Sequence, residues 1–502
     1  MTAQEKNPGA EPDMPDGEMS IDVLVLGSGI AGGCAALAAR EAGAQVLVVE
    51  PAETPGGHSR LSTGLVMASG SALHTAAGVT DSPDSFLRDY LNVVRQGVAP
   101  GPVRSYVDNS GATVDWLVQH GVRFHPRPVH GGNATVPRAL VAEGFGAGMM
   151  SALWTAARRA GVDIALRHRA LRLLRAGDRV VGALVQTPAG EQQVHARAVV
   201  LATGGFGANP ELLTEHYPAS NAVGDWLWNI GHEHNRGDGL VMAREIGAPA
   251  VGHDRGLRVL HADFVRTLEA TIPGWVVLVD GDGRRFVDET SQYGMVAHRT
   301  GAVGERAWAV LDARALDRPV DDRTTDYLQE IPGIAQRRSV NFAPAVLREH
   351  CAAGRIPTAD TLTELAAAVG LPAAQLVATI GQYNEGAQAG RDRFGKRADC
   401  LRAVDTAPYL AVEVRPASLV YTAYGPQIDE NACLLDELGG PVPGLFAAGE
   451  VTGGVLGDLY VGSGSGLGTA GTLGRTAGES AAAYAAYAAY AASAPGTAPN
   501  PS

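Results

Sequence analysis

The chain has 502 residues, of which 45% are hydrophobic and 19% charged, and its formal net charge is −13. Such a composition is typical of a folded globular protein, and the length predicts two or three domains. The acidic balance, without a cluster of lysines or arginines, argues against a nucleic-acid partner. The four cysteines are scattered and form no CxxC pair, which excludes a zinc ribbon and indicates a reducing compartment.

Both ends of the chain are predicted to be disordered. Residues 1–20 are acidic and rich in proline and glycine, and they lack the basic region and apolar core of a signal peptide. Near the other end, Tyr484, Tyr487 and Tyr490 are predicted to share the packed face of an alanine-rich helix, which a loose tail, 491–502, follows. No run of about 18 strongly apolar residues occurs, so we expect no transmembrane helix, no membrane partner and a cytoplasmic location.

The first ordered segment predicts a dinucleotide-binding βαβ unit. An apolar strand at 21–26 runs into a glycine turn, an alanine-rich helix follows, and a second strand ends at Glu50. In this pattern Gly27 permits the tight turn, Gly29 lets the backbone approach a pyrophosphate, and Gly32 lets the helix pack closely on the strand. A carboxylate at the end of the second strand can accept hydrogen bonds from a ribose.

Three later stretches favour FAD over NAD as the dinucleotide. The segments 55–64, 196–207 and 443–454 each return the chain to a glycine-containing turn, the last two directly after an apolar strand. A Gly-Asp turn within 236–248 opens a further helix. A domain that binds NAD does not need these additional glycine-containing turns. A domain that binds FAD does, because FAD extends past the first crossover and is held along its whole length.

The pattern changes in the middle of the chain. The strand-like stretch 275–289 gives way to polar helical stretches, which looks like an inserted second domain. The expected division is an FAD-binding domain at 21–252, a catalytic cap domain at 253–414, and the remainder of the FAD-binding domain at 415–490.

These motifs, in this order, resemble the FAD superfamily of fumarate reductases, succinate dehydrogenases and 3-ketosteroid Δ1-dehydrogenases, from residue 21 to about residue 480. The resemblance implies an α/β fold: a Rossmann-like FAD domain of the two-dinucleotide-binding type, with an inserted α+β cap. It also implies tightly bound FAD. The residues expected to hold FAD are Gly27, Ser28, Gly29, Ile30, Ala31, Gly32, Glu50, Pro51, Gly56, Gly57, His58, Ser59, Thr63, Gly64, Ala202, Thr203, Gly204, Gly205, Asp238, Gly449, Glu450, Ser465 and Leu467.

Two positions separate the branches of this superfamily. Fumarate reductases have one arginine four residues after the acid of an RFVNE-type turn and another in the C-terminal glycine-rich segment. Here "RRFVDETSQY" places Tyr293 at the first position, and "GEVTGGVLGDLY" places Tyr460 at the second. The ketosteroid dehydrogenases have tyrosine at both, followed at the second by glycines at the spacing of Gly462, Gly464 and Gly468.

That branch implies catalytic roles for three residues. Tyr460 and the backbone N–H of Gly464 would hold a ketone oxygen, and Tyr293 would remove the α-proton while the β-hydride passes to flavin N5. A phenol and an amide are neutral donors that can share one carbonyl oxygen, whereas an arginine suits a carboxylate. We therefore expect α,β-dehydrogenation of a cyclic or polycyclic ketone, or the reverse enone reduction.

The match departs from the ketosteroid branch in the segment 121–138, which lacks the tyrosine that supports the base there. His125 and His130 are candidate substitutes. A further histidine, His58, falls where succinate dehydrogenases attach flavin covalently, and we interpret it as a polar residue beside non-covalent FAD.

Two other functions remain open from the sequence. One is a fumarate-reductase-like reductase of an unsaturated carboxylate, with Arg299 or Arg285 repurposed. The other is a non-catalytic flavin- or ligand-binding protein. The partners expected are a small-molecule ketone or enone and an electron acceptor or donor that no motif identifies, in a monomer or a homodimer.

Overall fold

A computed structural model describes residues 21–95, 97–132, 134–267, 272–317, 339–457 and 459–493. The predicted N-terminal tail lies outside these residues. Of the predicted C-terminal tail, the first three residues continue the last helix and the others lie outside the described part of the chain.

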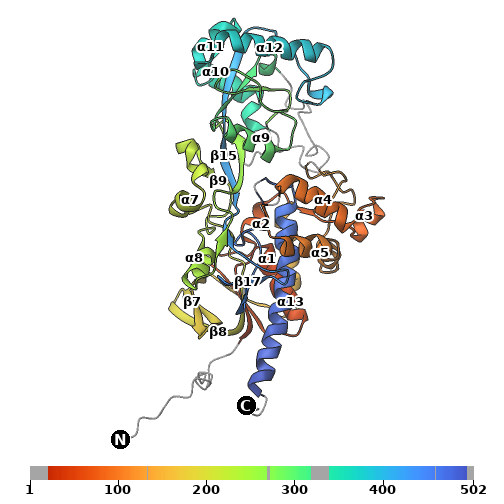
Figure 1. The fold of residues 1–502 in the computed structure, drawn as a ribbon, viewed down its shortest axis with the longest axis vertical. Coiled ribbons are helices and arrows are strands. Elements are labelled where there is room, and N and C mark those ends of the chain that lie inside the picture. Colours follow the sequence, from red (N-terminus) through yellow and green to blue (C-terminus); the bar gives the residue numbers. More distant parts are fainter. Residues whose placement is uncertain are drawn as a thin grey trace.

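A mostly parallel sheet forms the lower part of the molecule (Figure 1). In pairing order its main path comprises β17 (Cys433–Leu435), β18 (Pro441–Ala447), β8 (Gly190–Leu201), β1 (Ile21–Leu26), β2 (Val46–Glu50) and β5 (Asp163–Leu166). Leu26 is in register with Val49 on one side and with Leu201 on the other. The apolar runs of the central strands are buried on both faces, as parallel strands require. A hairpin of β6 (Arg169–Ala176) and β7 (Arg179–Thr187) extends this sheet from β8.

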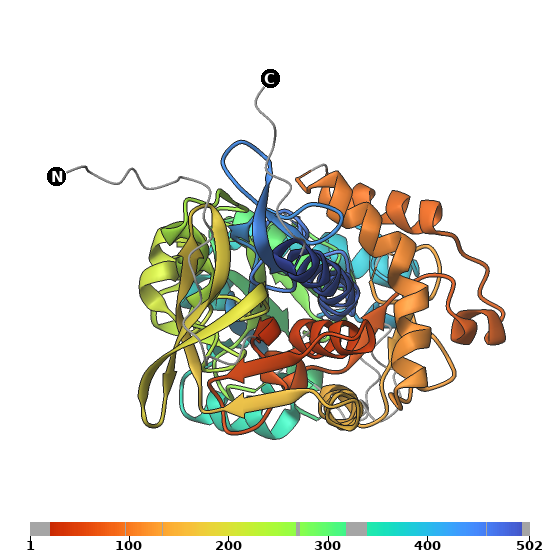
Figure 2. The ribbon, with the colours of Figure 1, turned by 90° about the horizontal axis from the view of Figure 1, so that it is seen from below.

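Two helices from opposite ends of the chain pack closely on this sheet. They are α1 (Ile30–Glu41) and α13 (Ser465–Ser493), which lie side by side in Figure 2. A Cβ on Gly474 would lie 2.4 Å from the carbonyl oxygen of Ala31, so the glycine allows the close approach of the backbones. The C-terminal segment therefore completes the domain that the N-terminal segment begins.

Further helices surround this sheet. They are α2 (Gly57–Leu61), α3 (Ala72–Ala76), α4 (Pro83–Val94), α5 (Pro100–Gln119), α6 (Phe145–Arg159), α7 (Pro210–His216) and α8 (Asp238–Glu245). Two separate two-stranded sheets complete this part of the molecule. They pair β3 (Leu65–Met67) with β4 (Ala139–Val141), and β10 (Ala250–Val251) with β16 (Gly425–Pro426).

A second sheet with its own helices forms the upper part of the molecule (Figure 1). Its strands are β11 (Gly256–His261), β15 (Tyr409–Thr422), β13 (Ala307–Leu311) and β12 (Val277–Val279), with β9 (Trp228–Asn229) and β14 (Thr358–Ala359) beside β15. Its helices are α9 (Tyr293–Ala302), α10 (Pro344–Ala352), α11 (Leu362–Val369) and α12 (Ala373–Gln388). Short 3₁₀ turns at Pro218–Trp226, Ala313–Leu316, Val340–Phe342 and Ala398–Cys400 complete the described elements.

The long strand β15 runs from the upper sheet down to the lower one, as Figure 1 shows. The division of the chain into three segments stays a prediction. Its second boundary, between residues 414 and 415, falls inside this strand, which remains paired with β11 as far as Thr422.

The last helix corrects one expectation. Tyr484 packs against Phe446, with ring centroids 6.1 Å apart, but Tyr487 and Tyr490 are 71% and 72% exposed. A three-residue spacing turns successive side chains around a helix, so only the first tyrosine still faces the sheet. None of the helices in the described ranges, α13 included, combines the length and the apolar character needed to cross a membrane.

Candidate cofactor site and active site

A long cavity lies at the carboxyl ends of the parallel strands of the lower sheet. It opens onto about 1420 Å³ of empty space, and its walls include the residues that directly follow β1, β2, β8 and β18. In open α/β sheets ligands bind at this edge. The parallel sheet thus places the four glycine-containing turns of the sequence around one cavity.

The first turn is shaped to receive an anionic group. Gly27 has φ +106°, and a Cβ there would lie 2.3 Å from the carbonyl oxygen of Ala202. A Cβ on Gly32 would lie 2.0 Å from the carbonyl oxygen of Gly27, so this glycine lets α1 approach the turn. The first turn of α1 contains no acidic residue and its N-cap, Gly29, makes no side-chain cap. The amides and the helix dipole there suit a pyrophosphate.

Glu50 accepts several hydrogen bonds within the protein, which its position in the sequence does not reveal. One carboxylate oxygen accepts hydrogen bonds from both the amide (2.9 Å) and the hydroxyl of Ser28, and the other accepts from the amide of Ala52 at 2.9 Å. The same Ser28 hydroxyl accepts from the amide of Gly56 at 2.9 Å. Because a carboxylate offers about four acceptor positions, one remains for a ribose hydroxyl. Glu50 therefore shapes the glycine turn as well as lining the cavity.

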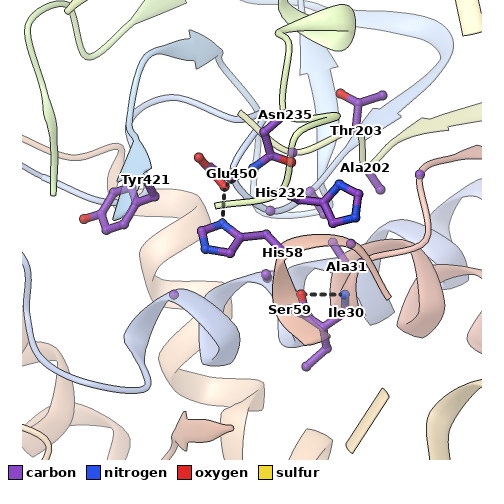
Figure 3. A pocket seen from close by; sticks show the side chains of 18 of the residues that line it. Ile30, Ala31, His58, Ser59, Ala202, Thr203, His232, Asn235, Tyr421 and Glu450 are labelled. Atoms are coloured by element: carbon purple, nitrogen blue, oxygen red, sulfur yellow. Dashed lines mark hydrogen bonds and ion pairs between the residues drawn. The ribbon is translucent and has the colours of Figure 1, made fainter. Parts of the chain in front are cut away.

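Further along the cavity, His58 and Glu450 point toward each other from α2 and from the turn after β18 (Figure 3). Glu450 also accepts hydrogen bonds from the amide of Thr422 at 3.0 Å and from the side-chain amide of Asn235 at 3.2 Å. Gly205 leaves room for this group, since a Cβ there would lie 2.3 Å from Glu450 Oε1.

The sequence reading missed a loop on the opposite wall. His232 and His234 line the cavity with rings 5.3 Å apart, and Asn235 follows them. Burial, together with the neighbouring His234, lowers the pKa of His232. The polar run "GHEHNRGDG", which includes the recognised Gly-Asp turn, could have indicated that polar side chains gather here. Asp238, which was predicted, lines the cavity and pairs with Arg169 through two short hydrogen bonds, 2.6 and 2.8 Å long.

Tyr460 lies at one end of the same cavity. Burial raises the pKa of its phenol, while hydrogen bonds with Ser465 and with the backbone of Gly466 and Gly464 oppose that rise. The amide of Gly466 lies 3.5 Å from the phenol oxygen. Gly464 has φ +97°, and a Cβ there would lie 2.8 Å from the amide nitrogen of Met67, so this backbone is held against β3. Tyr460 therefore lines the cavity with Gly464 close behind it, and their catalytic role stays a prediction.

Tyr293 is the first residue of α9 and lies against Tyr460, with ring centroids 6.1 Å apart. Its hydroxyl is 2.9 Å from Ser463 Oγ. Ser463 was not predicted, because nothing in the sequence links it to a residue 170 positions earlier. Of the two histidines considered as substitutes, the ring of His130 bonds to the carbonyl of Ala134 and the backbone of His125 bonds to that of Val141; their role stays a prediction.

Most predicted cofactor residues line the cavity, and some support it from behind. Those that line it are Gly27, Ser28, Gly29, Ile30, Ala31, Glu50, Pro51, Gly57, His58, Ser59, Ala202, Thr203, Gly204, Asp238, Gly449, Glu450 and Leu467. Those that do not are Gly32, Gly56, Thr63, Gly64, Gly205 and Ser465. Several of the latter are needed for packing; Gly64, for example, has φ +70° and meets the backbone of Phe145.

Arg285, one of the two arginines considered for a carboxylate substrate, already forms ion pairs within the protein. Arg285 bonds to Glu289 (2.7 Å) and to Asp392 (2.5 Å), and all three side chains are nearly inaccessible to solvent. Lys396, also buried, lies 3.1 Å from Glu289. Two cations therefore face two carboxylates in the upper part of the molecule. Arg299, the other candidate, has its guanidinium 3.5 Å from the carbonyl oxygen of Phe286.

The residues present fit FAD. The cavity combines an anion-binding turn, a carboxylate with one free acceptor position, and enough length to continue past the first crossover to Tyr460. Replacing Gly27 or Gly32 of this turn with any other residue would place a side chain against backbone atoms. Fold and site together define an FAD-dependent flavoprotein.

The chain belongs to the FAD binding domain family, whose model matches residues 22–467. It is 32% identical over 474 residues to a probable fumarate reductase of Shewanella frigidimarina, covering 91% of this chain and 74% of that one. It is 26% identical over 568 residues to 3-oxosteroid 1-dehydrogenase of Mycobacterium tuberculosis, covering 91% and 97%.

Solved structures agree. The 3-ketosteroid-delta4-(5alpha)-dehydrogenase of Rhodococcus jostii superposes with a TM-score of 0.77 at 27% identity, covering 94% of this chain and 100% of that one. The predicted fold, the predicted cofactor and the predicted superfamily are confirmed. The protein is an FAD-dependent oxidoreductase acting on CH–CH bonds.

Proposed function

We propose that the enzyme catalyses α,β-dehydrogenation of a cyclic or polycyclic ketone, or the reverse reduction of an enone. The observation that carries this proposal is a pair of phenols: Tyr460 lines the end of the cofactor cavity, and Tyr293 lies against Tyr460. They occupy the two positions where the fumarate-reductase branch has arginines. The relatives named above include a fumarate reductase and a steroid dehydrogenase, so sequence similarity alone does not choose between carboxylate and ketone.

Tyr460 and the Gly464 N–H bind the ketone oxygen. Because its pKa is raised, the phenol of Tyr460 keeps its proton at neutral pH and acts as a donor. Its oxygen accepts a hydrogen bond from the amide of Gly466, which polarises the O–H bond toward the substrate. Negative charge develops on the ketone oxygen as the α-proton leaves, and each such donor typically contributes about 3 kcal/mol there.

Tyr293 removes the α-proton. A phenol has an ordinary pKa near 10 and needs a partner in order to act as a base at neutral pH. Ser463 Oγ, 2.9 Å away, supplies a hydrogen bond to the phenolate as it forms. We therefore assign to Ser463 the supporting role that a tyrosine has in the ketosteroid branch. When bound, FAD supplies the hydride acceptor.

The test measures hydrogen exchange and turnover separately. Tyr460→Phe leaves the Gly464 donor and should lower turnover of a reactive ketone by roughly 10²–10³-fold. Tyr293→Phe should lower it by roughly 10²–10⁴-fold. In D₂O without turnover, wild type should exchange the α-hydrogen, Tyr460→Phe should exchange it slowly, and Tyr293→Phe should not. Ser463→Ala should slow exchange and shift its pH dependence upward.

The matched control is Tyr484→Phe, which removes a phenol from α13 near Phe446, outside the cavity. It should leave turnover and exchange unchanged. Normal exchange in Tyr293→Phe would refute the base assignment. Efficient reduction of fumarate by the reduced enzyme, with no ketone or enone turned over, would refute the proposed substrate class.

A further inference from the structure

A histidine and a carboxylate face each other across the cofactor cavity in a way that binding FAD does not by itself require. His58 Nδ1 lies 3.5 Å from Glu450 Oε2, and the two side chains are 22% and 15% exposed. Figure 3 shows them meeting from opposite walls of the pocket. Charges in such a partly buried place interact more strongly than on the surface, because less water screens them.

The carboxylate has a fixed position. Glu450 Oε1 accepts from the amide and the hydroxyl of Thr422 at 3.0 and 3.3 Å, and Oε2 accepts from Asn235 at 3.2 Å. A Cβ on Gly205 would lie 2.3 Å from Oε1, so the group rests directly on that glycine. The carboxylate group is therefore held beside His58 by bonds within the protein.

The imidazole is positioned as well. A Cβ on Gly231 would lie 3.2 Å from His58 Cε1 and 3.3 Å from Nδ1, so the ring occupies space that only glycine leaves. The backbone of Gly231 is in turn bonded to Asn229 at 2.9 Å. The ring is thus confined between the Gly231 loop and Glu450.

Contacts along the cavity place this pair between the two ends of the cofactor. At one end, Glu50 bonds to Ser28 in the glycine turn, and the hydroxyl of Ser59, next to His58, accepts from the amide of Ile30 at 3.0 Å. At the other end, Glu450 accepts a hydrogen bond from Thr422 in β15. The residue before it, Tyr421, has its ring 5.5 Å from that of Tyr460. The pair therefore lies beyond the pyrophosphate turn, on the side of the tyrosines.

We infer that His58 takes up a proton when FAD is reduced, with Glu450 as its fixed counter-charge. Bound FAD would accept a hydride, that is two electrons and one proton, and would thereby gain one negative charge. One proton from solvent then binds the imidazole of His58, and the Glu450 carboxylate stays ionised. The cavity gains one negative and one positive charge, so its net charge does not change, which avoids leaving an uncompensated charge in a partly buried site.

Other titratable groups line the same cavity from the loop after β9, from β2 and from α8. They are His232, His234, Glu50 and Asp238. Glu233 acts on the pKa of His232 from the same loop, and Asp238 is paired with Arg169. His232 is the natural competitor for the proton, but burial and the adjacent His234 lower its pKa, so it stays neutral near pH 7. Glu50 is held by Ser28 and Ala52. Among the described residues, His58 is the histidine of this cavity that lies within ion-pair distance of a carboxylate.

The experiment measures the midpoint potential of the FAD-loaded enzyme between about pH 6 and pH 9, around the ordinary titration range of histidine. Wild type should take up two protons for every two electrons over part of this range. His58→Asn, which cannot titrate, should take up one. The matched variant His232→Asn should behave as wild type. Equal slopes in wild type and His58→Asn, or a change confined to His232→Asn, would overturn the inference.

A second measurement needs no variant. Photoreduction of the wild-type enzyme in weakly buffered solution near pH 7 should consume about two protons from solution per FAD, one for the reduced flavin and the extra one for His58, after correction for the protons released by the oxidised photodonor. A pH trace without this extra uptake would overturn the inference, as would FAD that remains attached to His58 after denaturation. Neither readout involves the ketone, so the inference can fail or stand independently of the proposed substrate.

Discussion

Glu50 offers a sharp test, because the structure gives it two tasks. The sequence predicts that it holds the adenosine ribose, so that Glu50→Ala weakens FAD binding. The structure adds that its carboxylate satisfies the amides of Ser28 and Ala52 and the hydroxyl of Ser28. A buried donor left without a partner costs about 1–3 kcal/mol. The side chain lines a cavity that water can enter, so we take about 1 kcal/mol for each donor. The FAD-free Glu50→Ala protein should therefore lose about 3 kcal/mol of its free energy of unfolding.

The assay separates the two tasks. Urea denaturation of the protein after removal of FAD reports the internal role, and titration of the same protein with FAD reports the ribose contact. Glu50→Gln is the matched variant: its amide oxygen still accepts a hydrogen bond, but its NH₂ group faces a donor, so its stability should fall between the other two. An FAD-free Glu50→Ala protein as stable as wild type would refute the internal role. Unchanged FAD affinity would refute the ribose contact.

Three further predictions follow from the same cavity. FAD should be released into the supernatant on acid precipitation, because we expect no covalent link; a yellow pellet would contradict this. Gly205→Ala should lower FAD affinity at least tenfold in titrations, since its Cβ would lie 2.2 Å from Thr422 Oγ1 and 2.3 Å from Glu450 Oε1; unchanged affinity would mean that the turn relaxes freely. Burial raises the pKa of Tyr106 and Tyr421, so the stability that their neutral forms provide is present below about pH 10 and lost above it. Tyr106→Phe should reduce the loss of the free energy of unfolding at alkaline pH, as measured by urea denaturation.

Features set by short-range spacing were predictable from the sequence. The turn at Gly27 and Gly29, the close approach at Gly32, and the acid at the end of β2 depend on residues within 30 positions of one another. Their geometry follows from the absence of a Cβ and from the direction of parallel strands. The dinucleotide-binding unit could therefore be recognised before any tertiary contact was known.

Long-range contacts were not predictable in this way. Ser463 meets Tyr293 only because the strand-rich upper part of the molecule brings α9 down onto the glycine-rich run. The histidine loop at 232–234 reaches the cavity because β9 pairs with β15, two strands almost 190 residues apart. Periodicity also failed for Tyr487 and Tyr490, since a repeated tyrosine does not reveal where the sheet beneath the helix ends.

The distribution of charge gives an independent argument for a neutral substrate. The hydroxyls that meet near the end of the cavity, those of Tyr293, Tyr460 and Ser463, carry no formal charge at neutral pH. One cation considered for a carboxylate, Arg285, is held by Glu289 and Asp392, and removing it from them would leave an unpaired charge. A carboxylate that met only the neutral hydroxyls would lose its hydration without gaining a cation, which typically costs several kcal/mol. A ketone oxygen has far less hydration to lose and finds neutral donors of the right kind in Tyr460 and the Gly464 amide. On the proposed function, we therefore expect the pocket to bind a ketone better than a carboxylate and to stabilise the enolate more strongly still.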